Sequence, residues 1–285
     1  MMPGRRRPPK AASAAIVAVI LASCANTATT TSPPMIATSA DDNMVIELSI
    51  GGGLAPPAVR VSDSLPRVWI GGDGRYLRQT SDGPANPALP TLEERRISET
   101  ALAGLLERAR SAGLLEDNPD YGTPRIADAM VTRIVIVTGG TRHRVLVSAL
   151  GYPNLGLDGT ALAARARLSQ FIDFLQDPER IGGVSGPVPY TPAELAVFVT
   201  GPAGSSAQKA PAAWPLGDLG TAGAPTDWPI RSARCLVLTG GDVTSVANAA
   251  AGKNRFASWR SGNSLWDIGL RPLMPDEHGC ADVVG

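Results

Sequence analysis

The pattern of apolar and polar positions divides the chain into three stretches. Residues 11–22 are nearly all apolar and carry no charge. Residues 24–42 are rich in Thr, Ser and Pro and have few large apolar side chains. From residue 43 onward, short apolar runs alternate with polar turns, as expected of a folded region with its own core. The middle stretch is therefore predicted to be a flexible tether.

Six short runs bounded by glycine or proline predict strands in the first half of the folded region. They cover residues 44–50, 67–70, 75–78, 91–97, 129–138 and 141–149. The glycines at 71–74 and 139–140 predict two tight hairpin turns. The strongly charged run 91–97 is expected at a sheet edge, and Pro56-Pro57 predicts an open loop.

Two longer helices are predicted from start signals followed by apolar stripes. Ser98 is expected to cap the first, which runs to a turn at Gly113. The second is expected to begin near Asp158 or Thr160 and to stop at Asp177-Pro178. Its stripe follows the spacing of a buried helix face, with Leu168, Phe171, Ile172 and Leu175.

The last third of the chain predicts a strand–helix–hairpin unit. Strand 195–200 is followed by a connection rich in Gly, Ala and Pro over 201–229. Strand 234–239, helix 242–251 and a hairpin of 256–260 with 265–270 come next. The predicted class is α+β, with antiparallel hairpins, two longer helices on one face and this C-terminal unit. The expected division is 1–23, 24–42, 43–200, 201–229 and 230–285.

The first 24 residues have the features of a bacterial signal peptide. Arg5, Arg6, Arg7 and Lys10 precede the apolar stretch, which is too short to span a bilayer. The sequence Leu21-Ala22-Ser23-Cys24 resembles the lipobox of bacterial lipoproteins. That resemblance implies cleavage after Ser23 and attachment of diacylglycerol, with acyl chains such as palmitate, to Cys24. The expected location is the extracytoplasmic face of the cell membrane, and the alternative is an ordinary secretory signal with a chance cysteine.

Charge argues against a nucleic-acid partner. Removing residues 1–23 removes four of the 26 basic residues and none of the 26 acidic residues, which leaves a net charge of −4. Nucleic-acid binding requires a basic face. No cofactor is expected from the residue pattern. The expected partners are the membrane, through the lipid on Cys24, and a protein or another component of the envelope.

Three cysteines are present, and lipidation of Cys24 leaves Cys235 and Cys280 as a pair. Outside the cytoplasm such a pair predicts a disulfide, which closes a loop and stabilises by about 4 kcal/mol. Two separate thiols are the main alternative. Metal binding is disfavoured because neither cysteine has a second ligand at a zinc-like spacing.

No catalytic set is predicted from the residue pattern. His143 stands between Arg142 and Arg144, and nearby positive charge is unfavourable for a general base. His278 is expected in a surface loop held by the disulfide. The serines next to glycine do not form a nucleophile elbow. The paired carboxylates are expected to be solvated surface, at Asp41-Asp42, Glu93-Glu94 and Asp276-Glu277.

Several strings resemble a family of uncharacterised secreted actinobacterial lipoproteins. They are Gly72-Asp73-Gly74, Ala112-Gly113-Leu114, Asp120-Tyr121-Gly122, Ala127-Asp128-Ala129, 235–240 and 270–277. The family has no assigned activity, so the resemblance implies location and fold. We expect a non-enzymatic binding or interaction domain of the cell envelope. The alternatives are an envelope hydrolase with an unrecognised site and a carrier of a small ligand or lipid.

Overall fold

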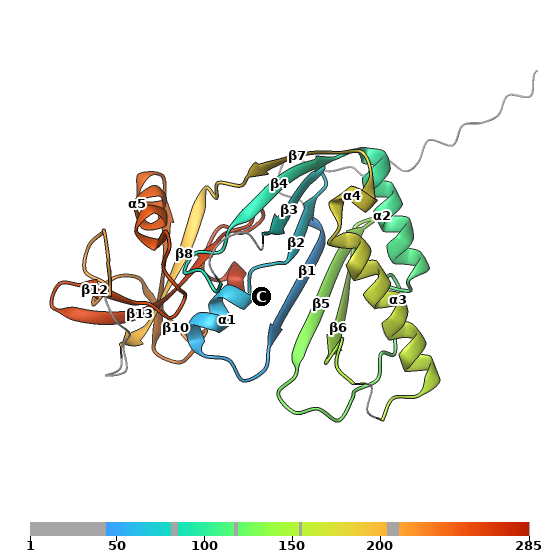
Figure 1. Ribbon diagram of the computed structural model, residues 1–285, viewed down its shortest axis with the longest axis horizontal. Coiled ribbons are helices and arrows are strands. Elements are labelled where there is room, and N and C mark those ends of the chain that lie inside the picture. The colour runs from blue at the N-terminus through green and yellow to red at the C-terminus, as the bar shows by residue number, and fades with distance from the viewer. Residues whose placement is uncertain (1–43, 81–84, 117–118, 154–155, 204–210, 285) are drawn as a thin grey trace, which may run out of the picture. The chain divides into compact units, whose positions relative to one another are not determined.

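The computed structural model describes residues 44–80, 85–116, 119–153, 156–203 and 211–284 (Figure 1). It confirms the α+β class, with two mainly antiparallel sheets and a few helices. The described residues all belong to one compact unit. The segments predicted as signal peptide and tether lie outside the described residues, and the division at 200 and 230 stays a prediction.

The first sheet has seven strands in the order β6-β5-β1-β2-β3-β4-β7. These are β1 (Met44–Gly52), β2 (Val68–Gly71), β3 (Arg75–Gln79), β4 (Leu92–Ile97), β5 (Met130–Thr138), β6 (Thr141–Ser148) and β7 (Val184–Pro189). Both predicted hairpins, β2–β3 and β5–β6, are present.

The expectation that the charged strand lies at a sheet edge is wrong. β4 pairs with β3 on one side and with β7 on the other. Its charges are compensated locally, because Glu93 lies 2.9 Å from both Arg78 and Arg95. The edge strand at this end of the sheet is β7, and the other edge strand is β6. The glycine and prolines of β7 do not form the alternating pattern that predicts a strand.

Three helices cover one face of the first sheet, namely α2 (Glu99–Ser111), α3 (Gly159–Leu175) and the short α4 (Pro178–Ile181) (Figure 1). The predicted caps are present. Ser98 accepts a hydrogen bond from the amide of Ala101 at 3.2 Å, and Asp158 accepts one from Ala161 at 2.9 Å. Apolar side chains of α2 and α3 form one packed cluster with alternate residues of β1, β5 and β6.

The second sheet has six strands in the order β10-β11-β8-β13-β12-β9. These are β8 (Glu194–Pro202), β9 (Ala212–Ala213), β10 (Ala224–Thr226), β11 (Ala233–Thr239), β12 (Ser258–Ser261) and β13 (Ser264–Pro272). Helix α5 (Gly241–Ala250) packs on one face through Val243 and Val246.

The predicted division groups strand 195–200 with the hairpins of residues 43–200. In the structure this strand, β8, lies in the second sheet between β11 and β13. Residues 195–199 are all buried. A strand that is apolar on both faces requires cover on both faces. Helix α5 packs against the cluster that contains Val197 and Val199, while Val61 of α1 (Pro57–Asp63) packs against Ala196 and Phe198.

The segment expected as an open loop after β1 contains a helix, α1 (Pro57–Asp63). Pro57 stands at its first position, where the missing N–H is not needed by the helix. Helix α1 packs on the second sheet: Val61 shares a buried cluster with Ala196 and Phe198 of β8. A Cβ atom on Gly269 of β13 would lie only 2.7 Å from Val61, so close packing here requires glycine.

The residues after β13, 273–284, form what we name the C-terminal segment, which ends in a 3-10 turn at Asp282–Val284. Leu273 and Val283 pack with the second sheet. Met274 packs with Trp69 and Val135 on the face of the first sheet that α2 and α3 leave uncovered. The predicted disulfide is confirmed and joins Cys235 of β11 to Cys280, so the segment is fastened to the second sheet.

Candidate functional site

A groove opens between β1, β5 and β6 of the first sheet and the C-terminal segment. It consists of two cavities of about 430 and 390 Å³. They adjoin, because both are lined by Ser64, Arg133, Arg144 and Val283. Each volume lies within the roughly 300–1,000 Å³ that is typical of small-ligand sites. We name the two cavities together the interlayer groove.

One wall of the groove is basic and comes from the hairpin β5–β6. Arg133, Arg142 and Arg144 point into the groove because alternate residues of neighbouring strands share a face. The guanidinium of Arg133 is compensated, since it lies 2.5 Å from the carboxylate of Glu47. Arg142 and Arg144 are exposed and make no ion pair with a residue in the described ranges. We name these three residues the basic wall.

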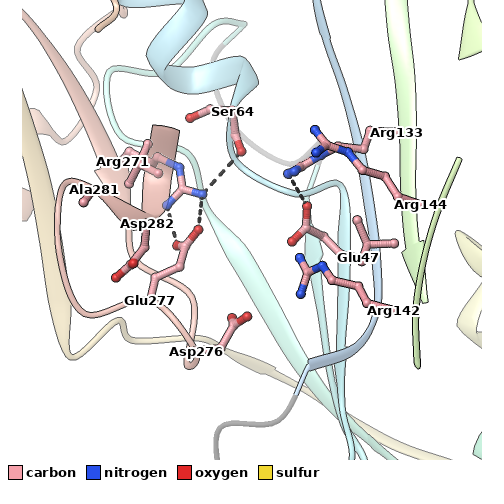
Figure 2. Close-up of a pocket in the computed structure, with 12 residues that line it drawn as sticks. Glu47, Ser64, Arg133, Arg142, Arg144, Arg271, Asp276, Glu277, Ala281 and Asp282 are labelled. Carbon is pink, nitrogen blue, oxygen red and sulfur yellow. Dashed lines mark hydrogen bonds and ion pairs between the residues drawn. The ribbon is translucent and has the colours of Figure 1, made fainter. Parts of the chain in front are cut away.

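The opposite wall is acidic and comes from the C-terminal segment, with Asp276, Glu277 and Asp282 (Figure 2). Glu277 is committed to structure: its two oxygens accept hydrogen bonds from Arg271 at 2.5 and 2.7 Å. Its Oε2 also accepts the amide of Met274 at 2.7 Å. The side chain of Arg271 is only 2% exposed, so this pair is fixed and desolvated.

Asp276 is the acidic group whose protonation is most perturbed. Its Oδ1 accepts a 2.8 Å hydrogen bond from the indole Nε1 of Trp69. Burial raises the pKa of Asp276 to about 6, and the negative charge of Glu277 adds to the rise, while the Trp69 hydrogen bond opposes it. Asp276 is therefore part-protonated in mildly acidic conditions.

The groove carries uncompensated charges of opposite sign on its two walls. The charges of Arg133 and Glu47 neutralise each other, and so do those of Arg271 and Glu277. The remaining charged side chains are Arg142 and Arg144 on one wall and Asp276 and Asp282 on the other (Figure 2). One oxygen of Asp282 accepts the amide of His278 at 2.8 Å. Such an arrangement attracts and orients a charged ligand.

The second cavity adds apolar surface to the groove. Its lining includes Leu146 of β6, whose side chain is 54% exposed, and Trp228. The indole of Trp228 is held edge-on against Phe198, with 4.9 Å between the ring centroids. Arg60 of α1 also lines this cavity, and it donates a 2.6 Å hydrogen bond to the carbonyl of Pro229.

The two histidines do not contribute to the groove. His143 shares a strand face with Val145 and Val147, which pack toward α2 and α3, so it points away from the groove. His278 belongs to the C-terminal segment but lines neither cavity. Within the described ranges, neither histidine side chain has a hydrogen bond to the other or to a serine.

The expectation that Asp276-Glu277 is solvated surface is wrong, because packing against Trp69 and Arg271 draws both carboxylates inward. Sequence reasoning also missed Arg142 and Arg144 as site residues. The available signal was their alternation with His143 and Val145 along one strand, which places both arginines on the same face. Cys24 lies outside the described residues.

Within the described ranges, no three His, Cys, Asp or Glu side chains are grouped so that they could hold a metal ion. None of the helices described is both long and apolar enough to cross a membrane. Comparison of the chain with protein-family models, with curated proteins and with solved structures gave no match.

Proposed function

We propose that this chain is a lipid-anchored lipoprotein of the bacterial cell envelope whose folded region binds a charged ligand or partner in the interlayer groove. The basic start, short apolar stretch and Cys24 motif support the anchor. The disulfide between Cys235 and Cys280 agrees with an oxidising compartment outside the cytoplasm.

The observation that carries the binding proposal is the pair of opposed walls with uncompensated charge. Arg142 and Arg144 are exposed, and isolated charges of this kind give specificity and attraction to a charged partner. The hydroxyls in the groove have other contacts. Ser64 donates to the carbonyl of Val61, and Ser49 accepts from Arg133. Neither of these two serines bonds to a histidine in the described residues, so we favour binding over nucleophilic catalysis.

One observation favours an envelope hydrolase as the second candidate. A carboxyl with a raised pKa in a groove is a possible general acid, and Asp276 meets that description. Turnover of an ester, peptide or glycoside substrate that is lost in Asp276→Asn would establish this alternative. The carrier alternative has less support, because packed side chains fill the space between the first sheet and helices α2 and α3.

The anchor is tested by growing cells with a palmitate analogue that can be labelled after lysis. Wild-type protein should carry the label and sediment with membranes. Cys24→Ser should carry none, because the thioether cannot form. Label retained in Cys24→Ser would overturn the proposed anchor.

The binding site is tested by affinity capture from intact envelopes with the full-length protein. Wild type should capture a component that Arg142→Gln/Arg144→Gln does not. The matched control is Arg110→Gln/Arg167→Gln, which removes the same charge from exposed positions on α2 and α3. Equal capture by both double variants would place the binding surface outside the groove.

A further inference from the structure

We propose that the interlayer groove binds a zwitterionic ligand, with an oxyanion on Arg142 and Arg144 and a primary ammonium on Asp276. This inference rests on the groove being the binding site of the proposed function and names the chemistry of its ligand.

The basic wall provides the oxyanion site. Arg142 and Arg144 are two residues apart on β6, so their Cα atoms are separated by about 7 Å along one face of the strand. Both side chains line the same cavity, and at this spacing they are long enough to reach one group that has several oxygens. Guanidinium groups match phosphate and carboxylate oxygens in geometry as well as in charge. Neither arginine has to leave an ion pair with another described residue in order to bind.

On the acidic wall, the carboxylate of Asp276 provides the ammonium site. Glu277 is held by the buried Arg271 on both of its oxygens and cannot turn toward a ligand without leaving that charge unpaired. Asp276 has a single side-chain donor within the described ranges, the indole of Trp69 on Oδ1. Its other carboxylate oxygen is the acceptor that an ammonium group would reach from the groove (Figure 2).

The opposition of the two walls selects against ligands of a single sign. A simple anion at Arg142 and Arg144 faces Asp276 and Asp282 across the same cavity. A simple cation at Asp276 faces the two arginines. A ligand that carries both signs satisfies each wall with its opposite charge, and like-charge contacts are avoided.

The size and lining of the groove suit either a small zwitterionic ligand or the charged end of a larger molecule. The cavity between the walls has a volume of about 430 Å³. It continues past Arg144 into the second cavity, where Leu146 and Trp228 offer apolar surface for the remainder of a ligand. Both phosphate–ammonium and carboxylate–ammonium ligands have the required chemistry, and the experiment distinguishes them.

The test is isothermal titration of the full-length protein at pH 7.5 with four probes. These are phosphoethanolamine, β-alanine, inorganic phosphate and ethanolamine. At least one zwitterion should bind about tenfold more tightly than inorganic phosphate and ethanolamine, which each engage one wall only. Tighter binding of phosphoethanolamine indicates a phosphate group in the natural ligand, and tighter binding of β-alanine indicates a carboxylate.

Variants assign the two ends of the ligand. Arg142→Gln/Arg144→Gln should lose binding of every oxyanion probe, whereas Arg110→Gln/Arg167→Gln should bind as wild type does. Asp276→Asn should remove the advantage of the zwitterion over phosphate and leave phosphate binding intact or stronger.

Equal affinity for phosphate and the zwitterions in wild type would overturn the inference, as would an advantage that persists in Asp276→Asn. Phosphate binding that depends on the arginines would then still support the groove as the binding site. If no probe binds, the zwitterion inference is wrong, and the capture experiment decides the proposed function separately.

Discussion

The indole Nε1 of Trp69 donates a 2.8 Å hydrogen bond to Oδ1 of Asp276, and the two residues are 207 positions apart in the chain. Trp69 is fully buried on β2 of the first sheet, while Asp276 belongs to the C-terminal segment that the disulfide fastens to the second sheet. This bond therefore helps to set the position of one wall of the interlayer groove relative to the other.

Replacing Trp69 with Phe should destabilise the protein by about 1–3 kcal/mol, because the donor to a partly buried carboxylate is lost and a small void is left. The measurement is urea unfolding at pH 7.5. Trp266→Phe is the matched control, since the buried Nε1 of Trp266 has no partner among the described residues. A larger loss in Trp266→Phe than in Trp69→Phe would contradict the role of this hydrogen bond.

Replacing Asp276 with Asn should stabilise the protein at neutral pH. The folded-state pKa of about 6 exceeds the ordinary value of 3.8, so the folded protein holds this proton more tightly. The free energy of unfolding then falls as pH rises from about 4 to 6. Above pH 6 the carboxyl of Asp276 is ionised in the folded protein, and the loss of stability from its ionisation is complete.

A two-unit shift corresponds to about 3 kcal/mol, and partial exposure reduces the expected gain to about 1–2 kcal/mol. Unfolding curves at several pH values should show Asp276→Asn more stable than wild type at pH 7.5 and equal to it near pH 3.5. The exposed Asp173 on α3 gives a control, Asp173→Asn. A stability difference between Asp276→Asn and wild type that does not change with pH would show that ionisation of Asp276 does not destabilise the folded protein.

Breaking the pair of Arg271 and Glu277 should be more damaging than replacing both partners. Glu277→Gln leaves a guanidinium that is 2% exposed without a countercharge, and we expect a loss of about 3–5 kcal/mol. Arg271→Met/Glu277→Leu removes both charges and should cost less. Thermal unfolding of the two variants and wild type makes the comparison, and a double variant that is less stable than Glu277→Gln would contradict it.

Removing the disulfide should lower stability by about 4 kcal/mol, because the bond closes a loop with a sequence separation of 45 residues. Cys235→Ser, Cys280→Ser and the double variant should lose similar amounts, since each removes the same bond. Guanidinium unfolding under non-reducing conditions measures this. A loss below about 1 kcal/mol would show that the C-terminal segment is held by packing alone.

The sequence by itself determined the elements whose causes are local. Ser98 and Asp158 bond to amides three residues ahead, so their helix starts could be read from neighbouring residues. The turn at Gly139-Gly140 fixed the β5–β6 register in the same way. Only two cysteines, Cys235 and Cys280, follow Cys24 in the sequence, which was enough to predict that they form a disulfide. Helix α1 was missed because two prolines also indicate a loop.

Only the tertiary structure decided which elements share a sheet and which charges are withdrawn from water. β8 follows the first sheet in the chain but pairs with β11 and β13, which come later. Asp276 and Glu277 look like surface carboxylates in their local sequence. Their burial depends on Trp69, far away in the chain, and on Arg271, whose own burial requires α1 and β13 to pack together. Contacts between distant residues determine burial and pKa, and local patterns of polarity do not encode them.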